Sequence, residues 1–268
     1  MKKLIGSLIV MALIPAVLIV GCSSTNPSPS GPAGPPGTPQ PTATVTATTV
    51  VVQQTPVTPP TVVQATVNLG AAANYGVLAY SGITNSGHST ICGDLGLYPL
   101  SHVGGGIKVT CGGVREVDNG TADTAKLNLG TAYADAAGRS GGAALVDNAD
   151  IGGLTLYPGL YKDGGNLSIA SANLTLDAQN NPDAVFIFQT AGILNVTSGR
   201  QVILANGASA ANIFWQVAGY CSLGTTVSFA GTIMAYTSVT MNTGAVLNGR
   251  ALAENGDVTL LANTITVP

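Results

Sequence analysis

The chain offers few side chains of the types that carry out acid–base or metal chemistry. His88 and His102 are its only histidines, and no cluster of histidine and cysteine has the spacing of a zinc site. No Gly-x-Ser-x-Gly motif stands between an expected strand and helix, where a serine hydrolase needs it. The acids that would serve a polysaccharide-cleaving β-helix are scattered: Asp163, Asp177, Asp183, Glu254 and Asp257. Asp177 and Asp183 are more typical of turn caps, so we expect no enzyme, no metal and no cofactor.

The composition favours a protein with little charge and small side chains. Of 268 residues, 8% are charged, 5% are aromatic and 35 are glycine, whereas ordinary domains carry roughly 25% charged residues. Nine Lys and Arg against twelve Asp and Glu provide no basic stripe for nucleic acid. The same scarcity leaves a helical bundle without a charged outer face. Many small residues together with Val, Ile, Thr and Asn favour an all-β protein with narrow, tightly stacked layers.

Residues 1–21 have the pattern of a signal peptide. Lys2 and Lys3 precede an apolar run over residues 4–20. Cys22 follows Gly21, which resembles the cleavage site of a lipoprotein and implies lipid on the sulfur of Cys22. A transmembrane anchor is the alternative, because the run is at the short limit for spanning a bilayer. Both alternatives export the rest of the chain, and the first displays it at the cell surface on a lipid anchor.

Residues 22–66 are expected to form a flexible tether. After Cys22 the segment is rich in Ser, Pro, Thr, Gly, Ala and Val and has no charged side chain. Its prolines oppose both helix formation and strand pairing, and its composition buries too little to offset the entropy of ordering. An extended spacer at roughly 3.1 Å per residue would reach on the order of 100 Å. A strand over residues 42–52 is the alternative for part of it.

Three cysteines remain after Cys22. Cys92 and Cys111 lie in a loop-rich region, residues 86–117, which we expect to cap the domain. An exported protein permits a disulfide between them, closing a loop of about 20 residues and contributing roughly 3 kcal/mol. Cys221 alternates with Leu223 and is expected to be buried. Other pairings of the three cysteines remain open.

Residues 67–268 are expected to form the folded domain, mostly from short strands. From residue 154 onward, alternating apolar and polar residues are separated by Gly and Asn turns. The expected strands are 166–170, 173–177, 184–189, 194–197, 201–205, 213–217, 221–223, 227–230, 232–236, 238–241, 246–248, 250–254, 258–260 and 264–267.

Spacing indicates how these strands stack. The segment that begins at Gly231 recurs at Gly249, and residues 214–216 lie one comparable step before residues 233–235. A period near 18 to 20 with three strands per period is typical of a three-faced β-solenoid. Alternation then predicts three inward faces: Val196, Leu223, Val239 and Val258; Phe229, Leu247 and Ile265; and Phe186, Phe188, Phe214, Ile233 and Leu252.

One segment, residues 118–138, has the pattern of a helix instead. Asn119 or Thr121 is the expected N-cap, and Gly138 ends the pattern. Its apolar residues recur at spacings of three and four: Ala122, Ala125, Leu129, Ala132, Tyr133 and Ala136. Such a narrow, smooth stripe is suited to lying along a solenoid wall.

The chain resembles a known family at several motifs. These include VNLGAAANYGVLA at residues 67–79, GDLG at 93–96, TAYADAAGR at 131–139 and LTLYPGLY at 154–161. Further motifs lie at 174–179, 183–189, 212–217 and 248–253. In this order they resemble the bacterial, archaeal and fungal ice-binding proteins. The resemblance spans about residues 67–267 and implies a discontinuous β-solenoid with a parallel α-helix that binds ice outside the cell.

An ice-binding face needs a flat, rigid array, and alternation gives two candidate ladders of outward side chains. Threonine suits such an array because its χ1 is stiff and it presents a methyl and a hydroxyl together. The first ladder is richer in hydroxyls and is favoured: Asn195, Thr197, Ser222, Thr225, Ser238, Thr240, Thr243 and Thr259, with Asp257 beside them. The second is Thr175, Ile203, Ser228, Val246, Thr264 and Thr266.

Some family members carry the motif Thr-Ala/Gly-x-Thr/Asn on the ice face. Here Thr243, Gly244 and Ala245 match three positions, and Val246 departs from the fourth. The sequence therefore predicts a monomeric, lipid-anchored surface protein that binds ice or ordered water, limits ice growth or recrystallisation, or holds the cell to ice. The alternative is a surface adhesin or carbohydrate-binding module on the same fold.

Overall fold

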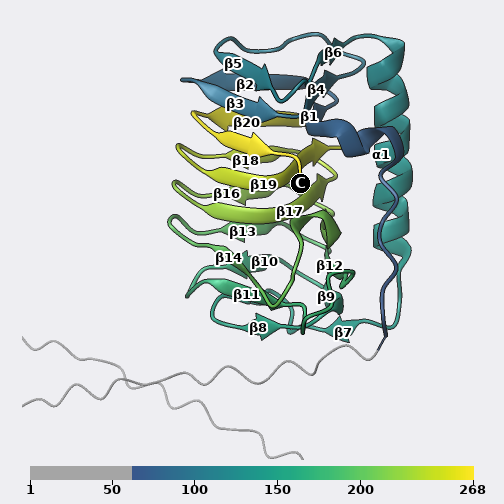
Figure 1. The fold of residues 1–268 in the computed structure, drawn as a ribbon, viewed down its shortest axis with the longest axis vertical. Helices are drawn as coiled ribbons and strands as arrows, with labels where there is room; N and C mark the ends of the chain where they lie inside the picture. Colours follow the sequence, from purple (N-terminus) through teal and green to yellow (C-terminus); the bar gives the residue numbers. More distant parts are fainter. Residues whose placement is uncertain (1–61) are drawn as a thin grey trace, which may run out of the picture. The chain divides into compact units, whose positions relative to one another are not determined.

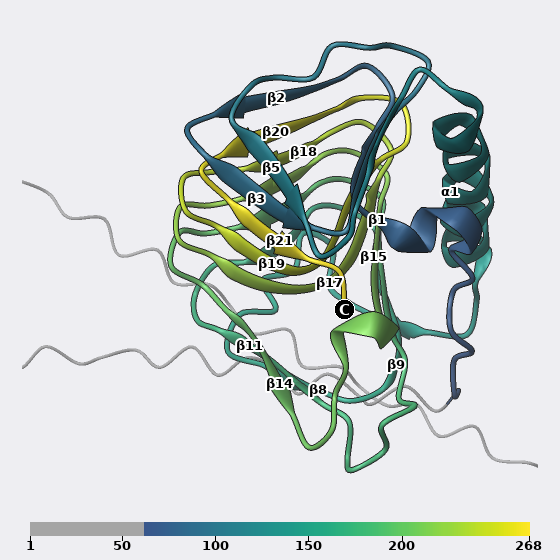
Figure 2. The ribbon, with the colours of Figure 1, turned by 45° about the horizontal axis from the view of Figure 1, so that its top comes forward.

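The computed structural model describes residues 62–268 (Figure 1). The expected signal peptide, Cys22 and residues 23–61 of the expected tether, with the alternative strand at 42–52, lie outside the described residues. Within 62–268, parallel strands form sheets of twelve, six and three strands that enclose an apolar core, and one long helix lies alongside (Figures 1 and 2). The expectation of a mainly β, three-faced solenoid with a helix is confirmed.

The solenoid is discontinuous along the chain. The N-terminal strands lie at one end of the stack, the helix α1 (Gly120–Gly138) then runs along its length, and the remaining strands return coil by coil (Figure 1). The first elements are η1 (Gly70–Asn74), β1 (Tyr75–Ala79), β2 (Gly82–Ser86), β3 (Ser89–Cys92), β4 (Asp94–Leu97), β5 (Ile107–Thr110) and β6 (Arg115–Val117). The last coil therefore stacks on the first strands, far away in sequence.

One wall is a six-stranded sheet with a single outward side chain in the middle of most strands. Its strands, in spatial order, are β10 (Leu167–Ile169), β13 (Leu194–Val196), β16 (Cys221–Leu223), β18 (Val239–Met241), β20 (Asp257–Leu261) and β2. In β13, β16 and β18 the first and third residues are buried and the second is exposed or partly exposed. The alternation that sequence predicted for this wall is confirmed.

A second wall, here called the helix wall, faces α1. It contains β7 (Ala143–Ala144), β9 (Gly159–Asp163), β12 (Phe186–Thr190), β15 (Ile213–Val217), the second halves of β17 (Ser228–Ala235) and β19 (Val246–Ala253), then β1, β4 and β6. Residues of β12 and β15 are buried on both faces, because the core covers one side and the helix covers the other.

The third wall is less regular. It contains β8 (Thr155–Leu156), β11 (Leu174–Asp177), β14 (Val202–Ala205), the first halves of β17 and β19, then β21 (Thr264–Thr266), β3 and β5. A short helix, η2 (Ala210–Asn212), precedes β15. The sequence expected separate strands at 227–230 and 232–236, and at 246–248 and 250–254. Each pair is one continuous strand that bends at Gly231 or Gly249.

The coil length changes along the stack. From Ser168 to Asn195 and from Asn195 to Ser222, stacked partners are 27 residues apart. From Ser222 to Thr240 the step is 18 residues, and from Thr240 to Thr259 it is 19. The expected period of 18 to 20 therefore holds only for the later coils. In the longer coils the additional residues lie on the third wall and its turns, which include β11, β14 and η2.

Two expected inward residues, Phe214 and Leu252, point the other way. The pairing places Phe214 beside Thr232, not Ile233, and the inward residues of the same strands are Trp215 and Ala251. Phe214 and Leu252 instead pack with the helix. The alignment of residues 214–216 with residues 233–235 was wrong by one residue, and in a strand a one-residue shift moves a side chain to the opposite face. The repeat from Gly231 to Gly249 is confirmed, and there Leu252 was assigned to the wrong face of its strand. Because both faces of this wall are apolar, the hydrophobic pattern could not reveal the error.

The helix rests on an oblique apolar stripe of the helix wall. Pairing aligns Leu160, Ile187 and Phe214 in one column, and Met234, Leu252 and Leu78 in the next. These residues pack with the small side chains of α1: Ala125, Leu129, Ala132 and Ala136. The Asn119 side chain accepts the Ala122 N–H at 2.9 Å, which identifies Asn119 as the N-cap. Within residues 62–268, no helix has the length and apolar character needed to cross a bilayer.

Polar side chains of the helix wall and of α1 itself fix the helix in place. The Gln189 amide donates to the carbonyls of Ala136 and Arg139, at 2.6 and 3.0 Å, at the C-terminal end of α1. At the other end, Lys126 is 7% exposed and its Nζ donates to the carbonyls of Ala253 and Glu254, each at 2.7 Å. These bonds satisfy groups that would be costly to bury unpaired. They fix the position of the helix along the apolar stripe, which is too smooth to fix it alone.

The chain before the domain also meets the helix end. The Arg139 guanidinium donates to the Thr66 carbonyl at 3.0 Å and also bonds to the Ala65 carbonyl. It forms an ion pair with Asp135 at 2.7 Å. The last residues of the expected tether are therefore held against the end of α1.

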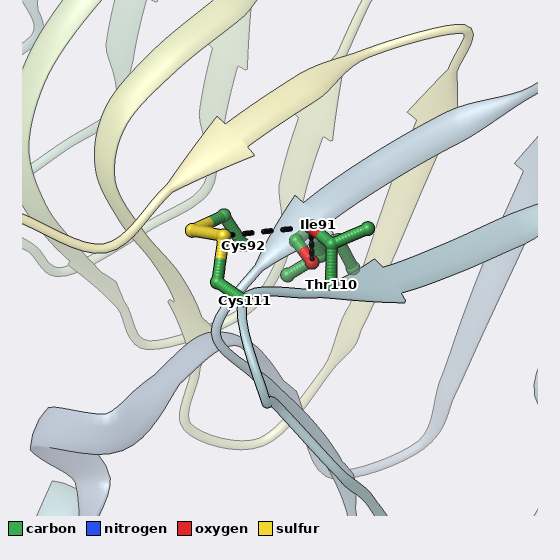
Figure 3. Close-up of a disulfide and its surroundings, with 4 residues drawn as sticks. All are labelled: Ile91, Cys92, Thr110 and Cys111. Atoms are coloured by element: carbon green, nitrogen blue, oxygen red, sulfur yellow. Dashed lines mark hydrogen bonds between the residues drawn. A yellow bond between two sulfur atoms is a disulfide. The ribbon is translucent and has the colours of Figure 1, made fainter.

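A disulfide holds the edge strand β5 to β3. Cys92 and Cys111 are bonded, with Cα atoms 5.0 Å apart and a sequence separation of 19 (Figure 3). Next to it, the Thr110 hydroxyl donates to the Ile91 carbonyl at 3.1 Å. The expected pairing is confirmed, and Cys221 is free and buried as expected.

We predict that Lys126 makes stability rise between about pH 8 and pH 10. Burial lowers the pKa of Lys126 to about 8, although Glu254 opposes that shift. Above pH 8 the unfolded chain holds a proton that the folded chain has lost, so the free energy of unfolding increases by about 1.4 kcal/mol per pH unit. Urea titrations should show this gain in the protein and not in Lys126→Met.

The rise of stability with pH should end near pH 10. Burial raises the pKa of Tyr75 and of Tyr161 to about 12, so their ionisation in the unfolded chain favours unfolding above pH 10. Lys108→Met, which changes an exposed lysine, is the control and should keep the gain. Equal pH profiles for the protein and Lys126→Met would contradict the prediction.

Candidate ligand-binding surface

The six-stranded sheet presents one straight column of outward polar side chains. Pairing without any shift in register aligns Ser168, Asn195, Ser222, Thr240, Thr259 and Thr84. Neighbouring strands are about 4.8 Å apart, so the six positions span about 24 Å. Four residues of the favoured ladder, Asn195, Ser222, Thr240 and Thr259, therefore lie in a single periodic array.

The array is rigidly backed. Behind each outward residue from Ser168 to Thr259, its two neighbours on the strand are buried in the core, as for Cys221 and Leu223 around Ser222, and Ile83 is buried beside Thr84. Burial also raises the pKa of the Cys221 thiol, so this cysteine acts as a small apolar side chain. Close packing below the sheet limits the movement of each strand. The side chains of the column are held at fixed spacing before any ligand arrives.

The other residues of the favoured ladder lie beside the column. Thr197 directly follows β13, and Ser238 directly precedes β18. Thr225 and Thr243 are exposed on the turns toward the third wall, where the Thr226 N–H donates to the Thr243 carbonyl at 3.0 Å. These four widen the polar surface without belonging to the column.

At one end of the array, hydrogen bonds orient the hydroxyls. The Thr259 hydroxyl lies 3.1 Å from the Asp257 carboxylate and 3.0 Å from the Thr84 hydroxyl. An ionised carboxylate only accepts, so Thr259 donates to Asp257 and accepts from Thr84. Asp257 therefore fixes the orientation of two hydroxyl groups of the column.

Two column residues, Ser168 and Thr84, were absent from the sequence ladder. Ser168 stands between Leu167 and Ile169, the same alternation that identified Asn195, and that pattern was sufficient to find it. Thr84 is different, because β2 joins the sheet through β20, 175 residues away. No local sequence pattern predicts that pairing.

The second ladder is not one array. Thr175 pairs with Ile203, Ser228 aligns with Val246 and Thr264, and Thr266 lies in another column beside Asn248. Ser228 faces Gln201 rather than Ile203, so β14 is offset from β17. On the far side, the column of Thr264 continues to Thr90 and then to the exposed Lys108. The third wall thus lacks a long, uniform row.

The partial motif at Thr243 occupies a corner. Thr243 and Gly244 form the turn between the six-stranded sheet and the third wall, and Gly244 has a φ of 70°. Val246 is 44% exposed on the third wall. The buried amide of Asn263 holds this turn by donating to the carbonyls of Asn242 and Ala245, at 2.8 and 3.1 Å. The motif residues therefore do not share one face.

The acids considered for catalysis serve the fold where they are buried. Asp163, 3% exposed, accepts the backbone N–H groups of Asn148, Ala149 and Gly165. Asp177 accepts from the Gln179 N–H at 2.8 Å, as expected of a turn cap. Asp150, which was not one of those acids, is also held by its neighbours: burial alone would raise its pKa, but hydrogen bonds keep that pKa below its usual value. Within residues 62–268, no three His, Cys, Asp or Glu side chains gather to hold a metal.

Comparison with known proteins finds matches across this region. A family model described as "Ice-binding-like" matches residues 77–266. An ice-binding protein of Flavobacterium frigoris is 40% identical over 217 residues, covering 75% of this chain and 76% of the relative. An ice-binding protein of a Colwellia species is 38% identical over 218 residues, covering 75% of this chain and 84% of the relative.

Among solved structures, ice-binding proteins also match this chain. The crystal structure of an ice-binding protein from an Antarctic biological consortium has a TM-score of 0.76 and 45% identity, covering 79% of this chain and 96% of that one. An ice-binding protein from the ascomycete Antarctomyces psychrotrophicus has a TM-score of 0.71 and 32% identity, covering 76% of this chain and 98% of that one.

We predict that Asp257→Ala releases the Thr259 side chain. Without the acceptor, the Thr259 hydroxyl loses its fixed direction, and the free energy of unfolding should fall by about 1 kcal/mol. Methyl NMR couplings of Thr259 and Thr84 report the rotamers. Asp257→Asn keeps an acceptor oxygen and should preserve them, so identical rotamer averaging in both variants would disprove the role of Asp257.

Proposed function

Because the chain belongs to the Ice-binding-like family, we propose that it adsorbs to ice through the six-stranded sheet. It is an antifreeze-type ice-binding protein, and its relatives are ice-binding proteins. We assign it no catalytic step, since those relatives are ice-binding proteins and not enzymes. The observation that carries the choice of face is the unbroken column from Ser168 to Thr84.

The chemistry of this column is suited to ordering water. Its hydroxyl and amide groups anchor water molecules, and the methyl groups of Thr84, Thr240 and Thr259 discourage bulk-like hydration between them. Because the strands fix the spacing, little side-chain entropy remains to be lost when ice forms on the surface. No lysine or arginine lies in the column, so no long, mobile charged group disturbs the array.

The third wall is a poorer candidate for the same purpose. Its outward residues are chemically mixed, and the row through Thr264 ends at Lys108. Val246 and Ile203 interrupt its hydroxyls and are 44% and 41% exposed. Lattice-like water needs a continuous set of anchors. The six-stranded sheet provides one, whereas the third wall does not.

The domain is further proposed to work at the cell surface, on a lipid attached to Cys22. The apolar run ending at Gly21, and the position of Cys22 directly after it, support cleavage and lipidation there. Residues 23–66 would then act as a tether that lets the array reach ice away from the membrane. Bound in this way, the protein would limit ice growth or recrystallisation near the cell, or hold the cell to ice.

The proposed face predicts the effect of a bulky substitution. Thr240→Tyr, in the middle of the column, should raise a ring above the array and lower recrystallisation inhibition at least about tenfold, a loss of about 1.4 kcal/mol or more. Labelled protein should coat a growing ice hemisphere, and Thr240→Tyr should coat it weakly. Circular dichroism should show an unchanged fold.

Thr264→Tyr is the matched control, because Thr264 is an exposed threonine on the third wall. It should keep its activity within about twofold. A loss in Thr264→Tyr with full activity in Thr240→Tyr would move the site to the third wall. Absence of coating by the unchanged protein would contradict ice binding itself.

The anchor proposal predicts a different result for Cys22→Ser. In a bacterial host that processes lipoproteins, the protein should incorporate labelled palmitate and sediment with membranes, whereas Cys22→Ser should incorporate none because it lacks the thiol. Ser23→Ala, at the next position, is the control and should be labelled. An unlabelled, uncleaved but membrane-bound protein would support a transmembrane anchor instead.

A further inference from the structure

A pocket of about 230 Å³ lies where α1 meets the corner between the helix wall and the six-stranded sheet. Four segments of the chain form it: the turn after β1, the residue after β4, the turn after β19, and the first half of α1. They contribute Tyr80, Tyr98, Glu254 with Asn255, and Asp123 with Lys126 and Leu127. None of these residues belongs to the polar column.

The polar groups of this pocket keep hydrogen-bonding capacity for a ligand. Within residues 62–268, neither the Asp123 carboxylate nor the Asn255 side-chain amide makes a hydrogen bond. Glu254 Oε2 is buried without a hydrogen-bond partner and lies 3.7 Å from Lys126 Nζ. Buried acceptors in native proteins are generally satisfied. That rule applies to Glu254 Oε2, whereas Asp123 is partly exposed and Asn255 is exposed. Together these two carboxylates and one amide are open to a ligand that brings several hydrogen-bond donors.

The apolar side chains of the pocket are exposed, so a flat ligand can pack against them. Tyr80 is 40% exposed and Leu127 is 67% exposed. A tyrosine ring beside free carboxylate and amide groups can pack against the C–H face of a sugar while those groups bind its hydroxyls. The volume suits one sugar ring.

The charges of the pocket favour a neutral ligand. Lys126 already places an ammonium 5.8 Å from the centroid of the Tyr80 ring and beside Glu254. The positive charge of this ammonium would repel an organic cation at the same ring but not a neutral ligand. Asp123 and Glu254 would in turn repel an acidic sugar.

We propose that this corner pocket binds one neutral pyranose unit of an extracellular polysaccharide. The Tyr80 ring packs against one face of the sugar, and Asp123, Asn255 and Glu254 accept from its hydroxyls. This site is separate from the ice-binding face, so the protein would hold a polysaccharide and ice at the same time. The proposal does not depend on which wall binds ice.

Saturation-transfer NMR on the full-length protein tests the pocket, in a detergent that has no sugar headgroup. The probes are the methyl pyranosides of glucose, galactose and mannose, with choline and glucuronate as charged alternatives. At least one neutral pyranoside should show saturation transfer with a millimolar Kd. Tyr80→Ala should raise that Kd about tenfold, and Asp123→Asn, which keeps the side-chain shape, should raise it several-fold.

Tyr220→Ala is the matched control, because Tyr220 is 45% exposed and lies outside the pocket. It should leave the Kd unchanged within about twofold. The proposal is overturned if no neutral pyranoside binds, if choline or glucuronate alone binds, or if binding survives both pocket variants. Ice-hemisphere coating by the same variants should be unchanged, so a failure of ice binding and a failure of sugar binding are told apart.

Discussion

The parallel hydrogen bonding between successive coils is the constraint on which the rest of the structure depends. It fixes neighbouring strands about 4.8 Å apart, and on the six-stranded sheet it does so without a shift of register. The same bonds set the spacing of the outward column and of the buried residues beneath it. Order inside the solenoid and order on its surface therefore have one cause. A ligand whose own molecules repeat in a lattice can use such a surface directly.

Stacking alone would leave the last coil without a neighbour and one wall uncovered, and the N-terminal part of the domain pairs with that coil and covers that wall. Strands β1 to β3 pair with the last coils, and the Cys92–Cys111 disulfide holds β5 at the end of the stack. The helix covers the wall that is apolar on both faces. Because the apolar outer face of that wall is covered, a protein with 8% charged residues can display a plain surface elsewhere.

The sequence was sufficient to predict the regularly alternating strands, but not the features that depart from the regular repeat. Alternation correctly gave the inward residues of the six-stranded sheet and four members of its outward column. It failed for Phe214 and Leu252, because both faces of the helix wall are apolar and one-residue register carries no signal there. It missed Thr84, whose place depends on a pairing across 175 residues. The 27-residue coils were also missed, since their extra residues lie in irregular turns.

The periodic and the irregular parts of this fold are suited to two different kinds of binding. A periodic wall repeats one chemical environment, so it can match another repeating surface but cannot distinguish one small molecule from another. Selectivity needs different groups converging on one point. In this protein different groups converge at the corner where the helix meets the turns after β1 and β19, and where Lys126 pairs with Glu254. The helix thus does more than cover a wall, because it supplies the irregular side chains that the stacked coils lack.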